Sequence, residues 1–195
     1  MSGRTAQFTS LYTSAGQRKY LTPAERAQFI AAARVCPRAE LRTFCLTLAS
    51  TGCRISEALD VRGRSVEAGA GFIALRSLKR RNGAVVIREV PVPADLLNEL
   101  EAVHGISALA DRCLWTWSRS RAWQLVKSVM AEAQIGPGIH ATPKGLRHGF
   151  GIHAIRSGVP INLVQRWLGH SRMETTAIYL QALGDEEREI AARMW

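Results

Sequence analysis

The chain has 195 residues, a length typical of a single domain, and lysine and arginine outnumber aspartate and glutamate by 26 to 16. The resulting net charge of +10 favours a polyanionic partner such as DNA, RNA or an anionic membrane, although a merely basic soluble protein has the same composition. No apolar run approaches the roughly 18 residues that a spanning helix needs, and residues 1–17 lack the apolar core of a signal peptide. We therefore expect a cytoplasmic protein that has no membrane partner.

The cysteine spacing argues against a metal site. Cys36, Cys45, Cys53 and Cys113 form no C-x-x-C motif, the spacing that zinc and redox sites usually use. Three of the four lie in apolar sequence with helical periodicity, so reduced thiols in the core are the better interpretation. We expect no structural metal.

The N-terminal part predicts a short arm followed by helices. Residues 1–20 are polar and contain three basic residues but no acid, which predicts a flexible basic arm. Thr22-Pro23-Ala24-Glu25 predicts a helix start, with a threonine cap, a proline at the first helical position and a glutamate that completes a capping box. A second helix is expected after Pro37, and Gly52 permits a sharp turn before a third helix that runs through Leu59.

Residues 64–93 predict a small antiparallel sheet. Residues 72–75 and 84–87 are strand-like, and Asn82-Gly83 between them is a strong hairpin signal. Pro91 and Pro93 are expected to end the sheet.

From residue 94 the sequence is mainly helical again. Thr142-Pro143 is expected to open one helix, and Ser171 with Glu174 is expected to form a capping box for the helix that carries Tyr179. The predicted fold class is mainly α with a small antiparallel β-sheet (α+β).

Arg54 and Glu57 are the first candidate site residues. Arg54 follows the glycine turn, and a helix would bring Glu57 onto the neighbouring surface. A guanidinium held in this way can bind a phosphate bidentately. A surface ion pair explains the same two residues, and for this motif alone it is the better explanation.

The predicted hairpin is strongly basic. It carries five cations and no acid, namely Arg76, Lys79, Arg80, Arg81 and Arg88. A ribbon of this kind suits a DNA groove, and Lys79 could donate a proton to a leaving oxygen. Ordinary solvated side chains at a hairpin tip are an equally good explanation.

A third group of cations lies near a predicted helix start. Lys144, Arg147 and His148 fall within about the first two turns of that helix. Cations there oppose the helix dipole unless an anion is bound, which favours a phosphate site. His170 and Tyr179, near the C-terminus, are less specific, because a lone histidine or tyrosine is usually structural.

The ordered set of motifs resembles the tyrosine recombinases, or phage-type integrases. That family has the pattern T-G-x-R-x-x-E, a lysine in a β-hairpin, H-x-L-R-H, L-G-H and a tyrosine nine residues beyond that last histidine. The matching positions here are Arg54, Glu57, Lys79, Lys144, Arg147, His148, His170 and Tyr179. The resemblance runs from about Tyr20 to Leu183 and implies the catalytic-domain fold of these DNA breaking-rejoining enzymes.

The resemblance implies a mechanism without a cofactor. Tyr179 would attack a DNA phosphate and form a 3′-phosphotyrosyl link, while Arg54, Arg147 and His170 stabilise charge on the phosphate. Lys79 would protonate the leaving oxygen, and Glu57 and His148 would support these residues. The DNA contacts are assigned to Arg76, Arg80, Arg81 and Arg88.

Two departures from the family pattern stand out. Lys144 replaces the first histidine of H-x-L-R-H, which keeps a phosphate contact but provides a poor base unless its pKa is lowered. Type IB topoisomerases resemble this chain in having a lysine there. Twenty N-terminal residues also cannot form the family's clamp domain of roughly one hundred residues, so the chain resembles catalytic-domain-only members such as the fimbrial phase-switch invertases.

These expectations define three segments: a basic arm over 1–20, a catalytic domain over 21–184 and a C-terminal helical tail over 185–195 that either joins protomers or folds back in cis. The expected partners are double-stranded DNA, other protomers in a synaptic tetramer and an accessory DNA-binding protein, with a nucleoid-associated location. A type IB topoisomerase-like relaxase and a catalytically silent DNA-binding regulator are the alternatives.

Overall fold

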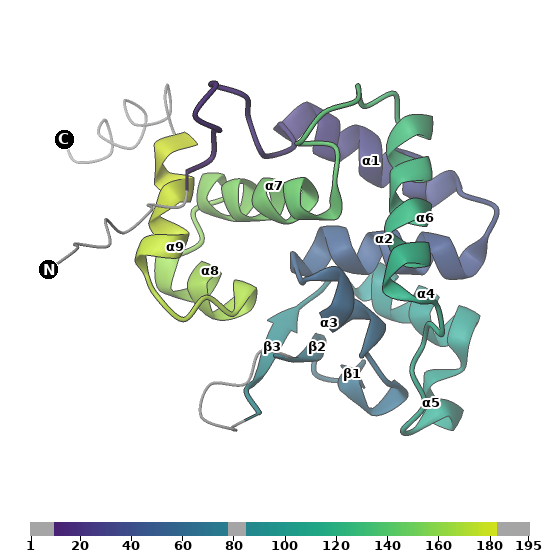
Figure 1. The fold of residues 1–195 in the computed structure, drawn as a ribbon. Helices are drawn as coiled ribbons and strands as arrows, with labels where there is room; N and C mark the ends of the chain where they lie inside the picture. Colours follow the sequence, from purple (N-terminus) through teal and green to yellow (C-terminus); the bar gives the residue numbers. More distant parts are fainter. Residues whose placement is uncertain (1–9, 78–84, 183–195) are drawn as a thin grey trace, which may run out of the picture.

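A computed structural model describes residues 10–77 and 85–182. Its helices and a three-stranded antiparallel sheet confirm the predicted fold class (Figure 1). In chain order the elements are α1 (Pro23–Val35), α2 (Ala39–Thr51), α3 (Ile55–Leu59), η1 (Gly63–Ser65), β1 (Val66–Glu67), β2 (Phe72–Arg76), β3 (Ile87–Pro91), α4 (Ala94–His104), α5 (Ile106–Leu109), α6 (Arg119–Glu132), α7 (Pro143–Arg156), α8 (Ile161–Leu168), α9 (Glu174–Ala177) and η2 (Ile178–Ala182). None of the described helices is both long enough and apolar enough to span a bilayer.

The predicted helix starts at α1 and α7 are confirmed. The Thr22 side chain accepts from the backbone N–H of Glu25, and the Glu25 carboxylate accepts from the backbone N–H of Thr22, which completes the capping box. Thr142 caps α7 through the backbone N–H of Gly145. Gly52 adopts φ 59° at the end of α2, a left-handed conformation that glycine adopts with little strain.

The sheet has the order β1-β2-β3, with Phe72 opposite Pro91 and Arg76 opposite Ile87. The first predicted strand is confirmed, but the return strand begins at Ile87 and includes Pro91, so its predicted position was too early. Pro91 is tolerated because it occupies the last position of an edge strand. Burial alternates along β3, and this alternation places Arg88 on the buried face together with Val90.

Two hydrophobic clusters meet at α7. The larger one packs α1, α2, α3, the sheet, α4 and α6 together, and Leu146 contributes to it from α7. The smaller one combines Phe150 and Ile152 of α7 with side chains of α8 and η2. In Figure 1, α7 lies between the α8–α9 segment and the rest of the helices. Arg147 and His148 therefore lie on α7 between the residues that contribute to the two clusters.

Residues 10–20 are anchored to the domain at a few points, which a flexible arm over 1–20 does not lead one to expect. Leu11 is fully buried in the smaller cluster, and the backbone N–H of Lys19 donates to the carbonyl of Leu11 over 2.8 Å. Arg18 forms an ion pair with Glu25. Burial of one leucine and a charge-assisted bond hold a segment whose composition alone suggested disorder. Residues 1–9 lie outside the described part of the chain.

The predicted capping box before Tyr179 is also wrong. Helix α9 starts at Glu174 with Met173 at its cap and no side-chain cap bond, and Ser171 is exposed. Tyr179 itself lies in the following 3-10 turn, η2. Ser171 lies three residues before the first helical residue, and the side chain of a capping residue reaches only the first turn after it.

The four cysteines are free thiols. Cys36, Cys45 and Cys53 are buried, as expected from their apolar surroundings.

Candidate active site

Arg54 and Glu57 form an ion pair at the start of α3. Arg54 Nη1 lies 2.7 Å from Glu57 Oε1, and the Arg54 backbone N–H donates to Glu57 Oε2 over 2.9 Å. The Glu57 side chain is 2% exposed, whereas that of Arg54 is 36% exposed. Burial opposes ionisation of Glu57, but Arg88 and Arg54 together with the backbone donor outweigh it and lower its pKa. The Arg54 guanidinium is therefore oriented by the buried Glu57 carboxylate. This arrangement differs from a solvated ion pair on the surface.

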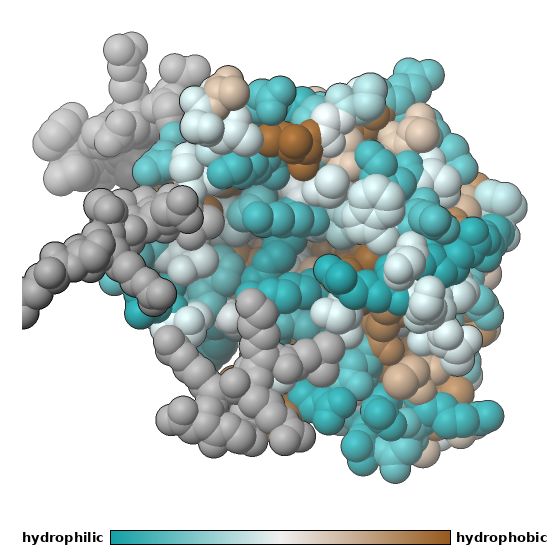
Figure 2. Space-filling view, viewed as in Figure 1, coloured by the Kyte–Doolittle hydropathy of each residue, from teal (hydrophilic) through white to brown (hydrophobic). Residues whose placement is uncertain are grey.

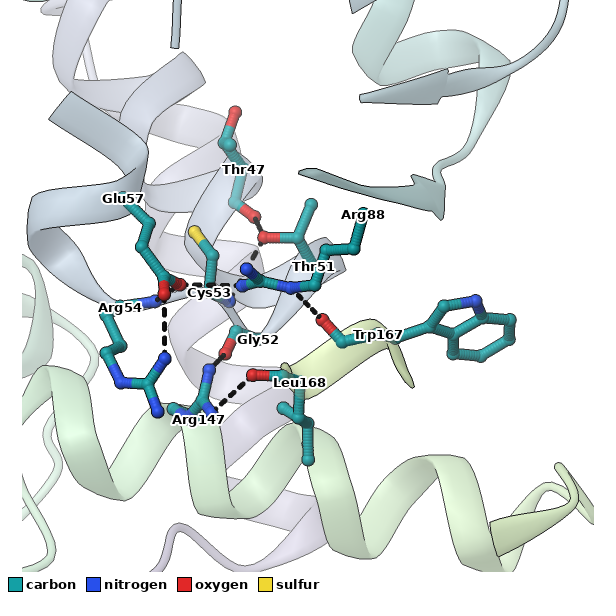
Figure 3. A network of polar contacts seen from close by, with 10 residues as sticks. All are labelled: Thr47, Thr51, Gly52, Cys53, Arg54, Glu57, Arg88, Arg147, Trp167 and Leu168. Carbon is teal, nitrogen blue, oxygen red and sulfur yellow. Dashed lines mark hydrogen bonds and ion pairs between the residues drawn. The ribbon is translucent and has the colours of Figure 1, made fainter. Parts of the chain in front are cut away.

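Arg88 completes this buried network, which leaves little of its side chain free for the DNA contact predicted for it. Its side chain is 4% exposed, and Arg88 Nη2 lies 2.6 Å from Glu57 Oε2. Arg88 Nε donates to the carbonyl of Trp167 over 2.7 Å, which ties β3 to the end of α8 (Figure 3). The inward register of β3 and the buried Glu57 carboxylate draw the guanidinium away from solvent. Arg88 Nη1 is also buried and has no hydrogen-bond partner within the described part of the chain.

Arg147 projects from α7 into the same region. Its Nη1 donates to the carbonyl of Gly52 over 2.7 Å, and its Nη2 donates to the carbonyl of Leu168 over 2.6 Å. These carbonyls lie at the C-terminal ends of α2 and α8, where the helix dipole favours a cation. Burial, followed by the nearby Arg54, lowers the Arg147 pKa to about 10, so Arg147 stays charged at neutral pH.

Arg54, Arg88 and Arg147, which we call the arginine cluster, lie close together, and the first two pair with the Glu57 carboxylate. Figure 3 shows Arg54 and Arg88 converging on Glu57, with Arg147 beside Arg54. Three cations and one anion leave an excess of positive charge at the end of α8. An anion such as a phosphate would offset that excess.

His170 follows directly after the end of α8. Gly169 ends the helix with φ 66°, and His170 Nδ1 lies 2.9 Å from Thr176 Oγ1. Burial is the main cause that lowers the His170 pKa to about 3, and Arg147 and Arg54 add to it. The imidazole is therefore neutral at physiological pH. A neutral imidazole still has one N–H group, which can donate a hydrogen bond to an anion.

Tyr179 is fully buried behind His170. Its hydroxyl lies 3.1 Å from His148 Nδ1, and its ring is stacked on His170 at a centroid distance of 6.3 Å. A Cβ atom on Gly151 would lie 2.5 Å from two ring carbons of Tyr179, so only glycine leaves room there. We call the surroundings formed by His148, Gly151 and His170 the tyrosine slot.

The slot holds the phenol in its protonated form. Burial raises the pKa of Tyr179 to about 12, and the opposing effect of Arg147 and Arg54 is smaller. In the resting protein the tyrosine is therefore a weak nucleophile that is also out of contact with solvent.

A cleft of about 970 Å³ opens beside the arginine cluster. It is lined by Arg54, Ser77, Val86, Ile87, Arg88, Glu89, Asn162, Gln165, Arg166, Gly169, His170, Ser171 and Thr175. Hydrophilic side chains gather over the middle of the face seen in Figure 2. The lining contains three arginines and one glutamate, so the cleft is suited to an anionic ligand.

Of the other predicted residues, Arg76 lies apart from this cleft. It forms a bidentate pair with Asp60 at 2.7 and 2.9 Å and lines a separate hollow of about 380 Å³. Lys144 is exposed in the first turn of α7. Lys79, Arg80 and Arg81 lie outside the described residues.

Sequence reasoning missed Gly151 and did not place Arg88 in the buried network. Gly149 and Gly151 are two glycines in the interior of one helix, a costly choice that usually indicates close packing, and this signal could have located the ring of Tyr179. The strand alternation Ile87-Arg88-Glu89-Val90 could have placed Arg88 beside Val90 on the inner face.

Comparison with known proteins places these residues in a family. The chain is 28% identical over 186 residues to the tyrosine recombinase XerA of Pyrococcus furiosus, a match that covers 90% of this chain and 61% of that protein. The crystal structure of XerA recombinase matches with a TM-score of 0.73 and 24% identity over 90% of this chain and 64% of that one. The XerH site-specific recombinase bound to its difH substrate matches with a TM-score of 0.71 and 17% identity over 92% of this chain and 59% of that one.

The chain thus spans less than two thirds of the length of these relatives. The family model described as "Phage integrase family" matches residues 19–186, which include the arginine cluster, the cleft and the tyrosine slot. The chain belongs to the phage integrase family.

Proposed function

We propose that this chain is the catalytic domain of a site-specific DNA recombinase that cuts and rejoins DNA through a 3′-phosphotyrosyl intermediate at Tyr179. The observation that carries the proposal is the convergence of Arg54, Arg147 and His170 near the stacked Tyr179 ring. These side chains come from three distant segments of the chain. Family membership and the DNA-bound XerH relative agree with this assignment.

The cleavage step follows from the charges in the site. The Tyr179 oxygen attacks the phosphorus, the bond from phosphorus to the 5′ oxygen breaks, and the leaving strand keeps a 5′ hydroxyl. Arg54, Arg147 and His170 stabilise the negative charge that builds on the non-bridging oxygens. Lys79, outside the described residues, is proposed to protonate the leaving oxygen. A 5′ hydroxyl of another strand then attacks the phosphotyrosyl link, and the energy of the broken ester is retained without ATP.

The proposed partners follow from the same chemistry. Double-stranded DNA supplies the phosphate, and exchange between two duplexes requires several protomers, which we propose to form a tetramer on DNA. We also propose that an accessory DNA-binding protein contributes to holding the DNA. Residues 21–184 form the proposed catalytic domain, and the tail over 185–195, outside the described residues, is proposed to join protomers. A nucleoid-associated cytoplasmic location is part of the proposal.

A nicked suicide substrate tests the function directly. Parent protein should form a covalent DNA adduct on a denaturing gel, and Tyr179→Phe should lose the adduct while DNA binding persists. Binding without any adduct from the parent protein would favour the silent regulator. An adduct with relaxation of supercoils but without exchange between two marked sites would favour the topoisomerase-like alternative.

The proposed hairpin contacts can be measured separately. Arg80→Ala combined with Arg81→Ala should reduce the slope of log affinity against log salt by up to about 2, since each phosphate contact contributes about 0.9. An unchanged slope would assign the DNA backbone contacts to other cations.

A further inference from the structure

The hydrogen bond between Tyr179 and His148 is the direct contact of the proposed nucleophile. His148 Nδ1 lies 3.1 Å from the Tyr179 oxygen, within the buried interior. His148 Nε2, the other ring nitrogen, is buried and has no hydrogen-bond partner in residues 10–77 and 85–182. Among the described residues, no other hydrogen-bond partner of the phenol is found.

The relative strengths of the donors and acceptors give the direction of this bond. In either direction the single bond leaves one donor and one acceptor of the pair without a partner, so the count alone does not decide. A phenol O–H is a stronger hydrogen-bond donor than an imidazole N–H, and an unprotonated imidazole nitrogen is a stronger acceptor than a phenol oxygen. The arrangement in which Tyr179 donates its proton toward His148 is therefore favoured.

His148 also has the appropriate charge state to accept a proton. Burial, together with the cations Lys144, Arg147 and Lys19, lowers its pKa to about 4. The ring is therefore neutral at physiological pH. The remaining titratable groups nearby are the neutral His170 and the protonated Tyr179, so cations surround His148 on the sides of α7 and of residues 10–20.

We propose that His148 is the catalytic residue that accepts the proton of Tyr179 during DNA cleavage. This inference rests on the function proposed above. As the bond from the phenol oxygen to phosphorus forms, the O–H bond breaks and its proton moves to His148 Nδ1, which leaves an imidazolium. In the rejoining step the same proton returns to the departing phenol. The exposed Lys144, at the position of the family's histidine, assists by binding phosphate.

Phosphate binding would make this transfer easier. The cations that disfavour an imidazolium in the resting protein, Lys144 and Arg147, are also cations that we assign to the phosphate. Their neutralisation by DNA raises the pKa of His148, while bond formation to phosphorus removes the basicity of the phenol oxygen. The resting tyrosine is unreactive for the same reason, because its proton has no strong acceptor until DNA is bound.

The direction of the bond can be tested on the unmodified protein without DNA. ¹⁵N-histidine NMR distinguishes the two neutral tautomers, and His148 should be the Nε2–H form with Nδ1 as acceptor. In Tyr179→Phe the Nδ1 resonance should move toward that of an unbonded nitrogen. An Nδ1–H tautomer in the parent would overturn the proposal.

The transfer itself can be tested by single-turnover cleavage of a nicked substrate. His148→Asn places an amide near the position of Nδ1 but cannot accept the proton, so cleavage should slow by about 10² or more. The low-pH fall in the rate should also be weaker than in the parent. His153→Asn, an exposed histidine on the same helix, is the matched control and should keep both the rate and the pH profile. Lys144→Ala should be slower but should retain the fall at low pH.

A more acidic nucleophile separates proton transfer from a structural effect. A fluorinated tyrosine at position 179 should accelerate His148→Asn much more than it accelerates the parent protein. Equal acceleration of both, or a normal pH profile in His148→Asn, would overturn the role of His148. If His148→Asn fails to fold, His148→Gln and the tautomer measurement still decide the question. Absence of any adduct from the parent protein would instead count against the proposed function.

Discussion

The arginine cluster and the tyrosine slot lie side by side but differ in how far each is ready for a reaction. In the cluster, Arg54 is oriented by a buried carboxylate and remains one third exposed toward the cleft. In the slot, Tyr179 has no exposed surface, and its pKa is raised. One region is preorganised to receive an anion, whereas the other keeps the proposed nucleophile protonated and covered.

This difference indicates an order of events. A phosphate can enter the cleft and meet Arg54 without a rearrangement of the cluster, because the ion pairs already hold the guanidinium groups. The Tyr179 oxygen does not line that cleft and must gain access to the phosphate after binding. We therefore expect phosphate binding to precede activation of the tyrosine, and the following predictions test each side of the comparison.

The largest effect is expected from breaking the buried part of the arginine cluster. Arg88→Met leaves the Glu57 carboxylate with one side-chain partner in an almost fully buried position. Loss of one partner of a buried ion pair typically costs about 3–5 kcal/mol. Urea unfolding should show this loss, whereas Arg76→Met, whose arginine is an exposed partner of Asp60, should be much milder. Equal losses would mean that the buried network does not stabilise the site.

Arg54→Ala should separate binding from cleavage. Removal of one oxyanion donor typically slows the chemical step by about 10²–10³. Single-turnover cleavage should slow by this factor, while DNA affinity changes less because other cations contact the backbone. Arg166→Ala alters the same cleft outside the arginine cluster and serves as the matched control. A cleavage rate equal to that of the parent would remove Arg54 from the phosphate site.

Mild acidification should destabilise the tyrosine slot. His148 and His170 have folded pKa values of about 4 and about 3, below the value near 6.5 expected in the unfolded chain. Their contribution is therefore fully present above pH 6.5 and is lost as pH falls toward those folded values. Between pH 6.5 and 5 each histidine should cost up to about 2 kcal/mol.

Thermal unfolding against pH checks this expectation. The midpoint should fall on acidification, and His148→Asn should fall less steeply than the parent because one of the two histidines is gone. A midpoint that does not change between pH 6.5 and 5 would contradict the neutral, buried state of both rings.

The smallest expected effect concerns the fit of the ring in the slot. The added methyl group in Gly151→Ala would lie 2.5 Å from Tyr179, so the ring must shift. Overpacking of this kind costs about 1–3 kcal/mol. The pKa of Tyr179 should decrease from about 12 toward that of an exposed tyrosine, measurable by spectroscopic titration. Gly136→Ala, with open space around its added methyl group, is the control and should leave this titration unchanged.

Much of the fold was determined by local sequence. The Thr22 capping box, the turn at Gly52 and the Thr142 cap depend on residues close together in the chain, so composition and spacing were sufficient to predict them. The order of the motifs predicted the family, and the family model confirms it. Helix starts and motifs of this kind are local properties, which is why they can be read before any tertiary contact is known.

The roles of individual side chains depended on tertiary structure. Arg88 is basic in a basic hairpin, and only its pairing with Glu57, 31 positions away, places it in the buried network. Leu11 orders residues that composition marked as an arm. The sequence determined that an arginine, a histidine and a tyrosine were available. Tertiary packing decided that the charge of Arg88 is buried and that Tyr179 keeps its proton. Burial and distant partners decide both, because they set the pKa of each group.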